Sequence, residues 1–250
     1  MYGIIQNKLN KGVYMVKKEV KTNLSLIDLV KEVAEETGYQ KNKYFTSLNQ
    51  ERFDKDDFIE TQKQFYYAVT FFSRPMGVLA ARIPTPQMRL EIVRNFWEEH
   101  GEGNFDKIHQ TTFAELLNRM DGTTLEEIES SHLSPYLRVF NTVLVGTCTL
   151  EDYRIGIAMM GIIEYMFSDI SGMIGRGIIK NGWLTDETII HYDIHEVLDV
   201  KHSKDFFDVI KKDWETSDEN KYLIKQGLEL GATIFNGLYR DLYESRSKRY

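Results

Sequence analysis

Three residues near the C-terminus have the types and the spacing of metal ligands. The run HEVLDVKH places His195, Asp199 and His202 at intervals of four and three residues. On an α-helix these intervals bring the three side chains to one face. Imidazole and carboxylate groups are ligands for iron, manganese and zinc, so the run predicts a site for one or two metal ions. The alternative is a solvated helix on which the same residues recur by chance.

A second candidate pair lies upstream in the run EEHGEGNFDKIH. Glu99 stands at the predicted end of one helix and His109 at the predicted start of the next, with Gly101 and Gly103 between them. Glycine adopts the backbone conformations that a tight turn requires, so the carboxylate and the imidazole are expected to be neighbours that share a metal. The alternative is that Glu99 belongs to a solvated helix end and His109 to the surface.

One acidic residue, Glu164, stands inside the apolar run IGIAMMGIIEYMF. It is the only charged residue between Arg154 and Asp169. A helix that is apolar on every side is typical of a protein core. An ionised carboxylate buried without a partner costs several kcal/mol, so Glu164 must be protonated, paired with a buried Arg, or bound to a cation. Metal ligation is the hypothesis that we carry forward.

The composition excludes several classes of function. The chain has 250 residues, 42% of them hydrophobic, and no low-complexity tract, which predicts one domain with a large core. The formal net charge is −7 and the basic residues are scattered, apart from the terminal SRSKRY, so no nucleic-acid partner is expected. We see no apolar run of membrane-spanning length and no signal peptide, and expect a cytoplasmic protein that acts on a small molecule and binds no membrane.

Apolar residues recur with helical periodicity along most of the chain. The pattern predicts an all-α, single-domain bundle of about seven helices over residues 23–250, and bundles of this kind form metal sites between facing helices. Residues 1–22 are ambiguous and are expected to form an N-terminal arm or a short hairpin. The predicted helices span 26–33, 58–72, a stretch after 86, 112–120, 135–148, 150–179, 189–214 and 222–243.

The motifs resemble those of the heme-oxygenase-like diiron oxidases and oxygenases, a family similar in fold to heme oxygenase, thiaminase II and pyrroloquinoline-quinone synthase. Its members carry a Glu, a later His, and then His-x3-Asp-x2-His on a late core helix. This chain matches that order over roughly residues 50–245 with Glu99, His109, His195, Asp199 and His202.

The resemblance leaves one ligand open. Many members take a further glutamate from an earlier core helix, where this chain offers Gln64 in the middle of the predicted helix and Glu60 one turn before it. Other members use a glutamate on the central helix, which is the position of Glu164. The resemblance therefore implies Glu164 as the third carboxylate ligand, with Glu60 as the alternative.

The resemblance also implies the chemistry. Three carboxylates and three histidines are a plausible ligand set for two Fe²⁺ ions with positions open for O₂ as co-substrate. The implied activity is that of a non-heme diiron oxidase or oxygenase acting on a small carboxylated substrate, an amino acid or derivative or a fatty acid. A homodimer is the commonest state for a soluble enzyme of this size. Arg82, Arg89 and Arg94 could hold a substrate carboxylate, but each could equally cap a helix or form a surface ion pair. Candidates for the pocket lining are Phe65, Tyr66, Phe71, Phe72 and Tyr165, although aromatic residues at helical spacing usually belong to the core.

Three alternatives compete with this interpretation. A heme oxygenase carries its axial histidine on the first helix, whereas residues 1–99 contain no histidine. A cofactor-free or thiaminase-like enzyme needs a nucleophile, and the single cysteine, Cys148, lies in an apolar run that favours an unreactive thiol. A non-catalytic iron-binding protein would use the same ligands without oxidising a substrate. His100, His132 and His191 are first interpreted as residues without a role in the site, although His191, one turn before His195, could orient a ligand or gate the pocket.

Overall fold

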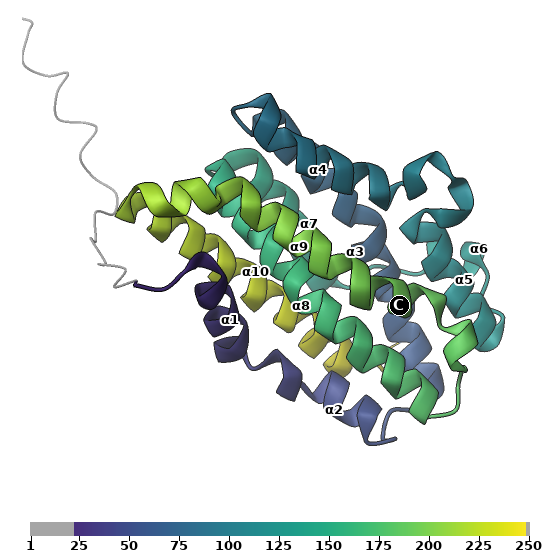
Figure 1. Cartoon of the computed structure of the whole chain (residues 1–250). Helices are drawn as coiled ribbons and strands as arrows, with labels where there is room; N and C mark the ends of the chain where they lie inside the picture. Colours follow the sequence, from purple (N-terminus) through teal and green to yellow (C-terminus); the bar gives the residue numbers. More distant parts are fainter. Residues whose placement is uncertain (1–22, 249–250) are drawn as a thin grey trace, which may run out of the picture.

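The fold is an all-α bundle, as predicted (Figure 1). The computed structural model describes residues 23–248, apart from the side chains of Asp186, Ile190 and residues 193–198. The predicted N-terminal arm lies outside the described residues. The described helices are α1 (Leu26–Thr37), α2 (Lys43–Asn49), α3 (Lys55–Arg82), α4 (Pro86–Glu99), α5 (His109–Asp121), α6 (Leu125–Ser130), α7 (Pro135–Leu150), α8 (Tyr153–Lys180), α9 (Ile190–Thr216) and α10 (Asp218–Ser245).

The described helices outnumber the predicted ones because α2 and α6 were missed. Each is too short to show a full apolar period, and their starts are set by single capping side chains, Asn42 for α2 and Thr124 for α6. Helix α3 extends beyond the predicted 58–72 and reaches Arg82, although Pro75 lies within it and proline usually ends a helix. The helix continues past it because Met76 and Leu79 bury their side chains in the core.

Helix α8 is the centre of the bundle, and α9 and α10 run along it (Figure 1). Its buried residues occur on every side of the helix, as its apolar sequence indicated. A glycine lets α9 come close: a Cβ atom at Gly161 would lie 2.9 Å from the Cβ of Phe206. The tight contact between these two helices brings the middle of α8 against the region of α9 that carries the predicted ligands.

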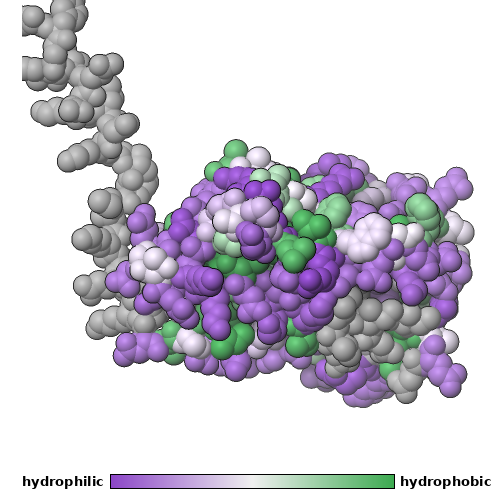
Figure 2. All heavy atoms as spheres, turned by 45° about the horizontal axis from the view of Figure 1, so that its top comes forward, coloured by the Kyte–Doolittle hydropathy of each residue, from purple (hydrophilic) through white to green (hydrophobic). Residues whose placement is uncertain are grey.

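The apolar character of α8 also bears on the expectation that the chain lacks a membrane span. By length and composition alone this helix could cross a membrane, so the chain does contain one apolar run of that length, but 78% of its most apolar stretch is buried inside the protein. The core helix of a packed bundle has this property. On the face drawn in Figure 2 the surface is mainly hydrophilic, with small and separate hydrophobic areas.

Candidate metal centre

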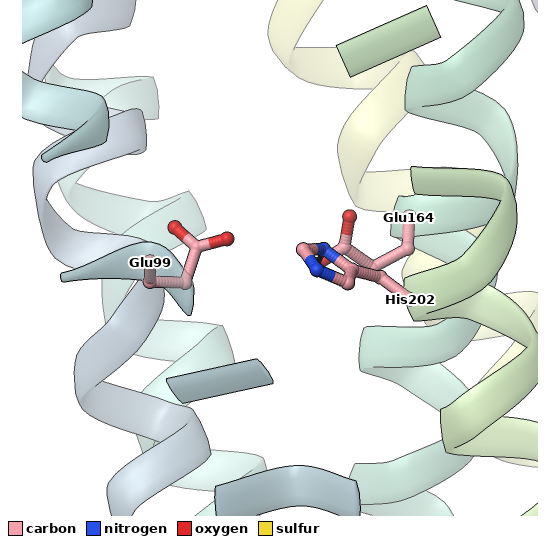
Figure 3. Close-up of side chains that lie close together, drawn as sticks. All are labelled: Glu99, Glu164 and His202. Carbon is pink, nitrogen blue, oxygen red and sulfur yellow. Dashed lines mark ion pairs between the residues drawn. The ribbon is translucent and has the colours of Figure 1, made fainter. Parts of the chain in front are cut away.

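Three buried ligand groups from three helices converge between α4, α8 and α9 (Figure 3). Glu99, Glu164 and His202 offer ligand atoms that all lie within 4.8 Å of one another. Their side chains are almost inaccessible to solvent. In Figure 3 the carboxylate of Glu99 points across a gap towards the imidazole of His202 and the carboxylate of Glu164. Because ligands lie about 2.1 Å from a bound transition metal, such spacing is close to what one ion needs.

His109 joins this group through Glu99. The Nδ1 atom of His109 lies 2.9 Å from Oε2 of Glu99, and both residues are buried. Burial disfavours the imidazolium form, but the negative charge of Glu99, helped by Asp199 and Glu98, outweighs burial and raises the pKa of His109. The negative charge of Glu99 therefore favours a cation at this buried position, either the proton on His109 or a metal ion.

The turn between α4 and α5 brings these two side chains together. Gly101 has a φ of 63°, and a Cβ atom at that position would lie 2.7 Å from the backbone carbon of Lys107. Gly103 also has a positive φ, of 85°. Only glycine takes such a conformation and so close an approach without strain. The tight turn that the sequence indicated is present, and it returns the chain so that the start of α5 lies beside the end of α4.

Two atoms of the converging group lack a hydrogen-bond partner within the described part of the chain: Oε1 of Glu164 and Nδ1 of His202. The two atoms are 4.0 Å apart, and Nδ1 lies 3.7 Å from Oδ1 of Asp199, distances too long for hydrogen bonds. A buried polar atom without a partner costs about 1–3 kcal/mol. A cation held between these atoms would remove that cost.

The second nitrogen of the His202 ring is held by Glu98, a residue that the sequence interpretation had not singled out. Oε2 of Glu98 lies 2.7 Å from Nε2 of His202, and Lys201 donates to the same carboxylate. Burial acts to raise the pKa of Glu98, but the bonds from Lys201 and His202 prevail and lower it, so Glu98 is ionised. An ionised acceptor requires the proton on Nε2, which leaves the lone pair of Nδ1 facing Glu164 and Asp199.

Glu164 lies among like charges. Burial, followed by the charges of Asp199 and Glu99, raises its pKa well above the ordinary value. The sequence interpretation had also considered an ion pair with a buried arginine, but among the described residues no Lys or Arg contacts Glu164. The local excess of negative charge can be neutralised by protons or by metal cations, and the donor set of carboxylates and imidazoles fits iron.

The remaining predicted ligands are placed as follows. Asp199 is fully buried beside His202. The backbone of His195 belongs to α9 one turn earlier, while its side chain lies outside the described residues. Glu60, the alternative carboxylate, is not part of the group: it pairs with Lys63 at 2.9 Å and lines a separate pocket with Arg246.

His191 is buried beside the predicted ligand His109, with ring centroids 6.4 Å apart. Its Nδ1 atom lies 2.9 Å from the hydroxyl of Thr112. The arrangement is compatible with the predicted orienting role, which stays a prediction. His132 is exposed, and the ring of His100 bonds to the carbonyl of Phe96 at the end of α4.

The three arginines considered for a substrate carboxylate have other partners. Arg82 donates to the carbonyl groups of Cys148 and Glu151, which end α7. Arg89 donates to carbonyl oxygens at the end of α3, and Arg94 pairs with Glu91 on its own helix. Each therefore caps a helix or forms a surface ion pair.

A small cavity of about 40 Å³ adjoins the converging ligands. Two of the predicted lining residues, Phe65 and Phe72, belong to it. The other three predicted residues do not line it. Tyr165 lines a groove between α8 and α9. The hydroxyl of Tyr66 accepts a hydrogen bond from Gln110, and the ring of Phe71 lies beside Arg74. The full lining is Phe65, Ala68, Val69, Phe72, Glu99, His109, Phe140, Ile163, Glu164, Phe167 and Phe235.

Solved structures define the class of fold. The chain is similar to a TenA homologue from P. horikoshii OT3 (TM-score 0.71, 10% identity, 88% of this chain and 99% of that one). It is also similar to a domain of unknown function with a heme oxygenase-like fold from Shewanella denitrificans OS217 (TM-score 0.72, 14% identity, 92% and 99%). A TenA family transcription regulator from Silicibacter sp. TM1040 matches with a TM-score of 0.65 and 12% identity over 86% and 95%. At these identities the likeness shows a heme-oxygenase-like fold alone.

A comparison of the sequence with models of protein families shows the family. The model of the family described as iron-containing redox enzymes matches residues 60–233, and this chain belongs to that family. The matched range contains every ligand of the converging group. Among curated proteins none matches the sequence.

Proposed function

We propose that this protein is a non-heme diiron oxidase or oxygenase that oxidises a small organic substrate with O₂, in the cytoplasm. The proposed iron ligands are Glu99, His109, Glu164, His195, Asp199 and His202. The observation that carries the proposal is the convergence of buried carboxylates and an imidazole whose ligand atoms lie within 4.8 Å of one another. These residues would hold two ferrous ions, which when bound would supply electrons for the reduction of O₂.

The residues of this chain have separate tasks in that reaction. Glu98 keeps the proton of His202 on Nε2, so that Nδ1 is free to act as a ligand. Glu99 and His109 form a second pair of donors on the opposite side, from α4 and α5. The apolar cavity beside Glu164 excludes water from the reacting group of the substrate.

The substrate proposed from the family resemblance is a small carboxylated molecule, an amino acid or derivative or a fatty acid. None of the three arginines considered for its carboxylate is available, since each bonds elsewhere. The carboxylate is therefore expected to be held by another group.

The test is iron stoichiometry after anaerobic loading with ferrous iron and desalting. We expect two irons per chain in the wild type, fewer in His195→Ala and His202→Ala, and two in the control His132→Ala, because His132 is exposed. Substrate-dependent O₂ consumption then separates an oxidase from a protein that only binds iron. Iron uptake by the wild type no greater than that of the His202→Ala variant would overturn the proposal.

A thiaminase-like function has less support. The likeness to TenA homologues is one of fold, and the chain's one thiol, Cys148, is fully buried at the end of α7. Burial raises the pKa of that thiol to about 12, so it remains protonated and a poor nucleophile at neutral pH.

A further inference from the structure

The cavity beside the proposed metal centre has an apolar wall built by one face of α3. Phe65, Ala68, Val69 and Phe72 line it at intervals of three, one and three residues, which is the spacing of a single helix face. Its polar lining residues within the described part of the chain are Glu99, His109 and Glu164, all of them proposed iron ligands. The other described residues that border the cavity have hydrocarbon side chains.

Aromatic rings from four helices hold the shape of this cavity. The ring of Phe65 packs against Phe167 with centroids 5.6 Å apart, and Phe167 packs against Phe235 at 6.0 Å. Phe235 in turn stacks on Phe140 at 5.9 Å. Because each ring packs against the next, the rings cannot easily change rotamer, and the cavity wall stays apolar.

The charge of the lining limits what enters. No Lys or Arg borders the cavity in the described part of the chain, and the charged or ionisable side chains that do border it are proposed metal ligands. An ammonium or guanidinium group would lose its hydration shell, and the available carboxylates already serve the metal. An uncharged hydrocarbon group has no such hydration shell to lose and needs no partner of opposite charge.

We propose that the part of the substrate that enters this cavity is a short, uncharged aliphatic segment, and that substrates with a cationic chain end are rejected. The inference rests on the proposed function and names the class of its substrate. The cavity volume of about 40 Å³ has room for roughly three water-sized groups, so only a few carbon atoms enter and the polar end of the substrate stays outside.

Ala68 sets the depth of the cavity. It is buried and is the smallest side chain on its wall, on the face of α3 that looks towards the ligands. Leucine at this position would occupy the space that the substrate needs, without replacing any proposed ligand. Ala81 provides a matched control, because it belongs to the same helix and is exposed.

The experiment compares two probes with the same carbon chain, hexanoate and 6-aminohexanoate, by calorimetric titration of the anaerobic ferrous protein and of the metal-free protein. We expect 6-aminohexanoate to bind at least about tenfold more weakly, because its ammonium group must be desolvated. Ala68→Leu should abolish hexanoate binding while retaining two irons, and Ala81→Leu should change neither. If Ala68→Leu does not fold, Ala68→Val should show a smaller loss in the same direction.

The outcomes separate the inference from the proposed function. A wild type that takes up no iron contradicts the proposed function, and hexanoate binding to the metal-free protein that Ala68→Leu abolishes would then still support an apolar cavity. A wild type that takes up two irons but binds 6-aminohexanoate as tightly as hexanoate, or binds neither, overturns the inference alone. Unchanged hexanoate binding in Ala68→Leu would also overturn it.

Discussion

Glu98 orients His202: its Oε2 atom lies 2.7 Å from Nε2 of the imidazole, while Nδ1 on the other side of the ring faces Glu164 and Asp199. The neighbouring residue, Glu99, faces the converging group itself. Two adjacent glutamates on one helix end thus have different tasks, one as a proposed ligand and one as the partner that fixes a ligand's tautomer.

Replacing Glu98 should weaken iron binding without removing a ligand. We expect Glu98→Gln to lower the iron affinity by about 10- to 100-fold, because the amide no longer demands the proton on Nε2. Competition with a chelator of known affinity measures the change. Glu91→Gln, on the same helix but paired with Arg94, is the control and should bind iron normally. Equal affinity in the two variants would contradict the orienting role.

Glu164→Gln should affect the metal-free and the iron-loaded protein in opposite directions. Without metal, the variant should be more stable by about 1–3 kcal/mol, because a buried carboxyl among like charges is replaced by a neutral amide. With iron, the variant should lose at least one ion per chain. Urea unfolding of both forms measures the two effects. A metal-free variant less stable than the wild type would show that the hydrogen bond between Glu164 and Asp199 outweighs the repulsion between the carboxylates.

The free energy of unfolding of the metal-free protein should fall as the pH rises above 4.5, the ordinary pKa of a glutamate carboxyl. The pKa of Glu164 is raised from 4.5, so between that value and the raised one the folded state holds a proton that the unfolded chain has lost. Stability then decreases with increasing pH. His109 has a raised pKa too, and its contribution is complete below 6.5 and is lost as the pH rises through the folded value.

Unfolding at a series of pH values, in the wild type and in Glu164→Gln, measures this dependence. The slope should be smaller in the variant, because one of the two titrating groups has been removed. Identical slopes would mean that Glu164 does not change its protonation on unfolding. Iron binding should show the opposite trend and improve with pH, since protons compete for the ligands.

Gly101→Ala should reduce both stability and iron affinity. The positive φ alone costs an alanine about 1 kcal/mol, and the new Cβ atom would clash with the backbone of Lys107 and push α5 away from α4. Gly122 is the matched control: its φ is 87°, but a Cβ atom there meets nothing within 4 Å. Gly122→Ala should therefore lose stability yet bind iron as the wild type does, which calorimetry and iron stoichiometry can establish.

Cys148 should be unreactive in the folded protein. Because burial raises its thiol pKa to about 12, a thiol reagent at neutral pH should modify it only after unfolding. Cys148→Ser should keep its iron and any O₂ consumption. Rapid modification of the native protein, or loss of activity in the variant, would revive the thiaminase-like alternative.

The sequence predicted the fold better than the finer geometry of the site. A lone charge in an apolar run is visible without a structure, which is why Glu164 stood out. The partner of Glu98 was not visible, because it lies 104 residues away and depends on how α4 packs against α9. For the same reason the sequence left the role of the arginines open between a substrate carboxylate, a helix cap and an ion pair: Arg82 binds carbonyl groups 66 and 69 residues away. Ala68 carried no signal, since its importance comes from the rings around it.

The position of the converging group on three helices has a mechanical consequence. Glu99, Glu164 and His202 belong to α4, α8 and α9, so an ion bound by all three joins segments from residue 99 to residue 202. The single cysteine leaves the chain without an internal disulfide. Iron would then act as a cross-link between these helices. Since it binds the folded state alone, the thermal unfolding temperature would rise with the concentration of available iron.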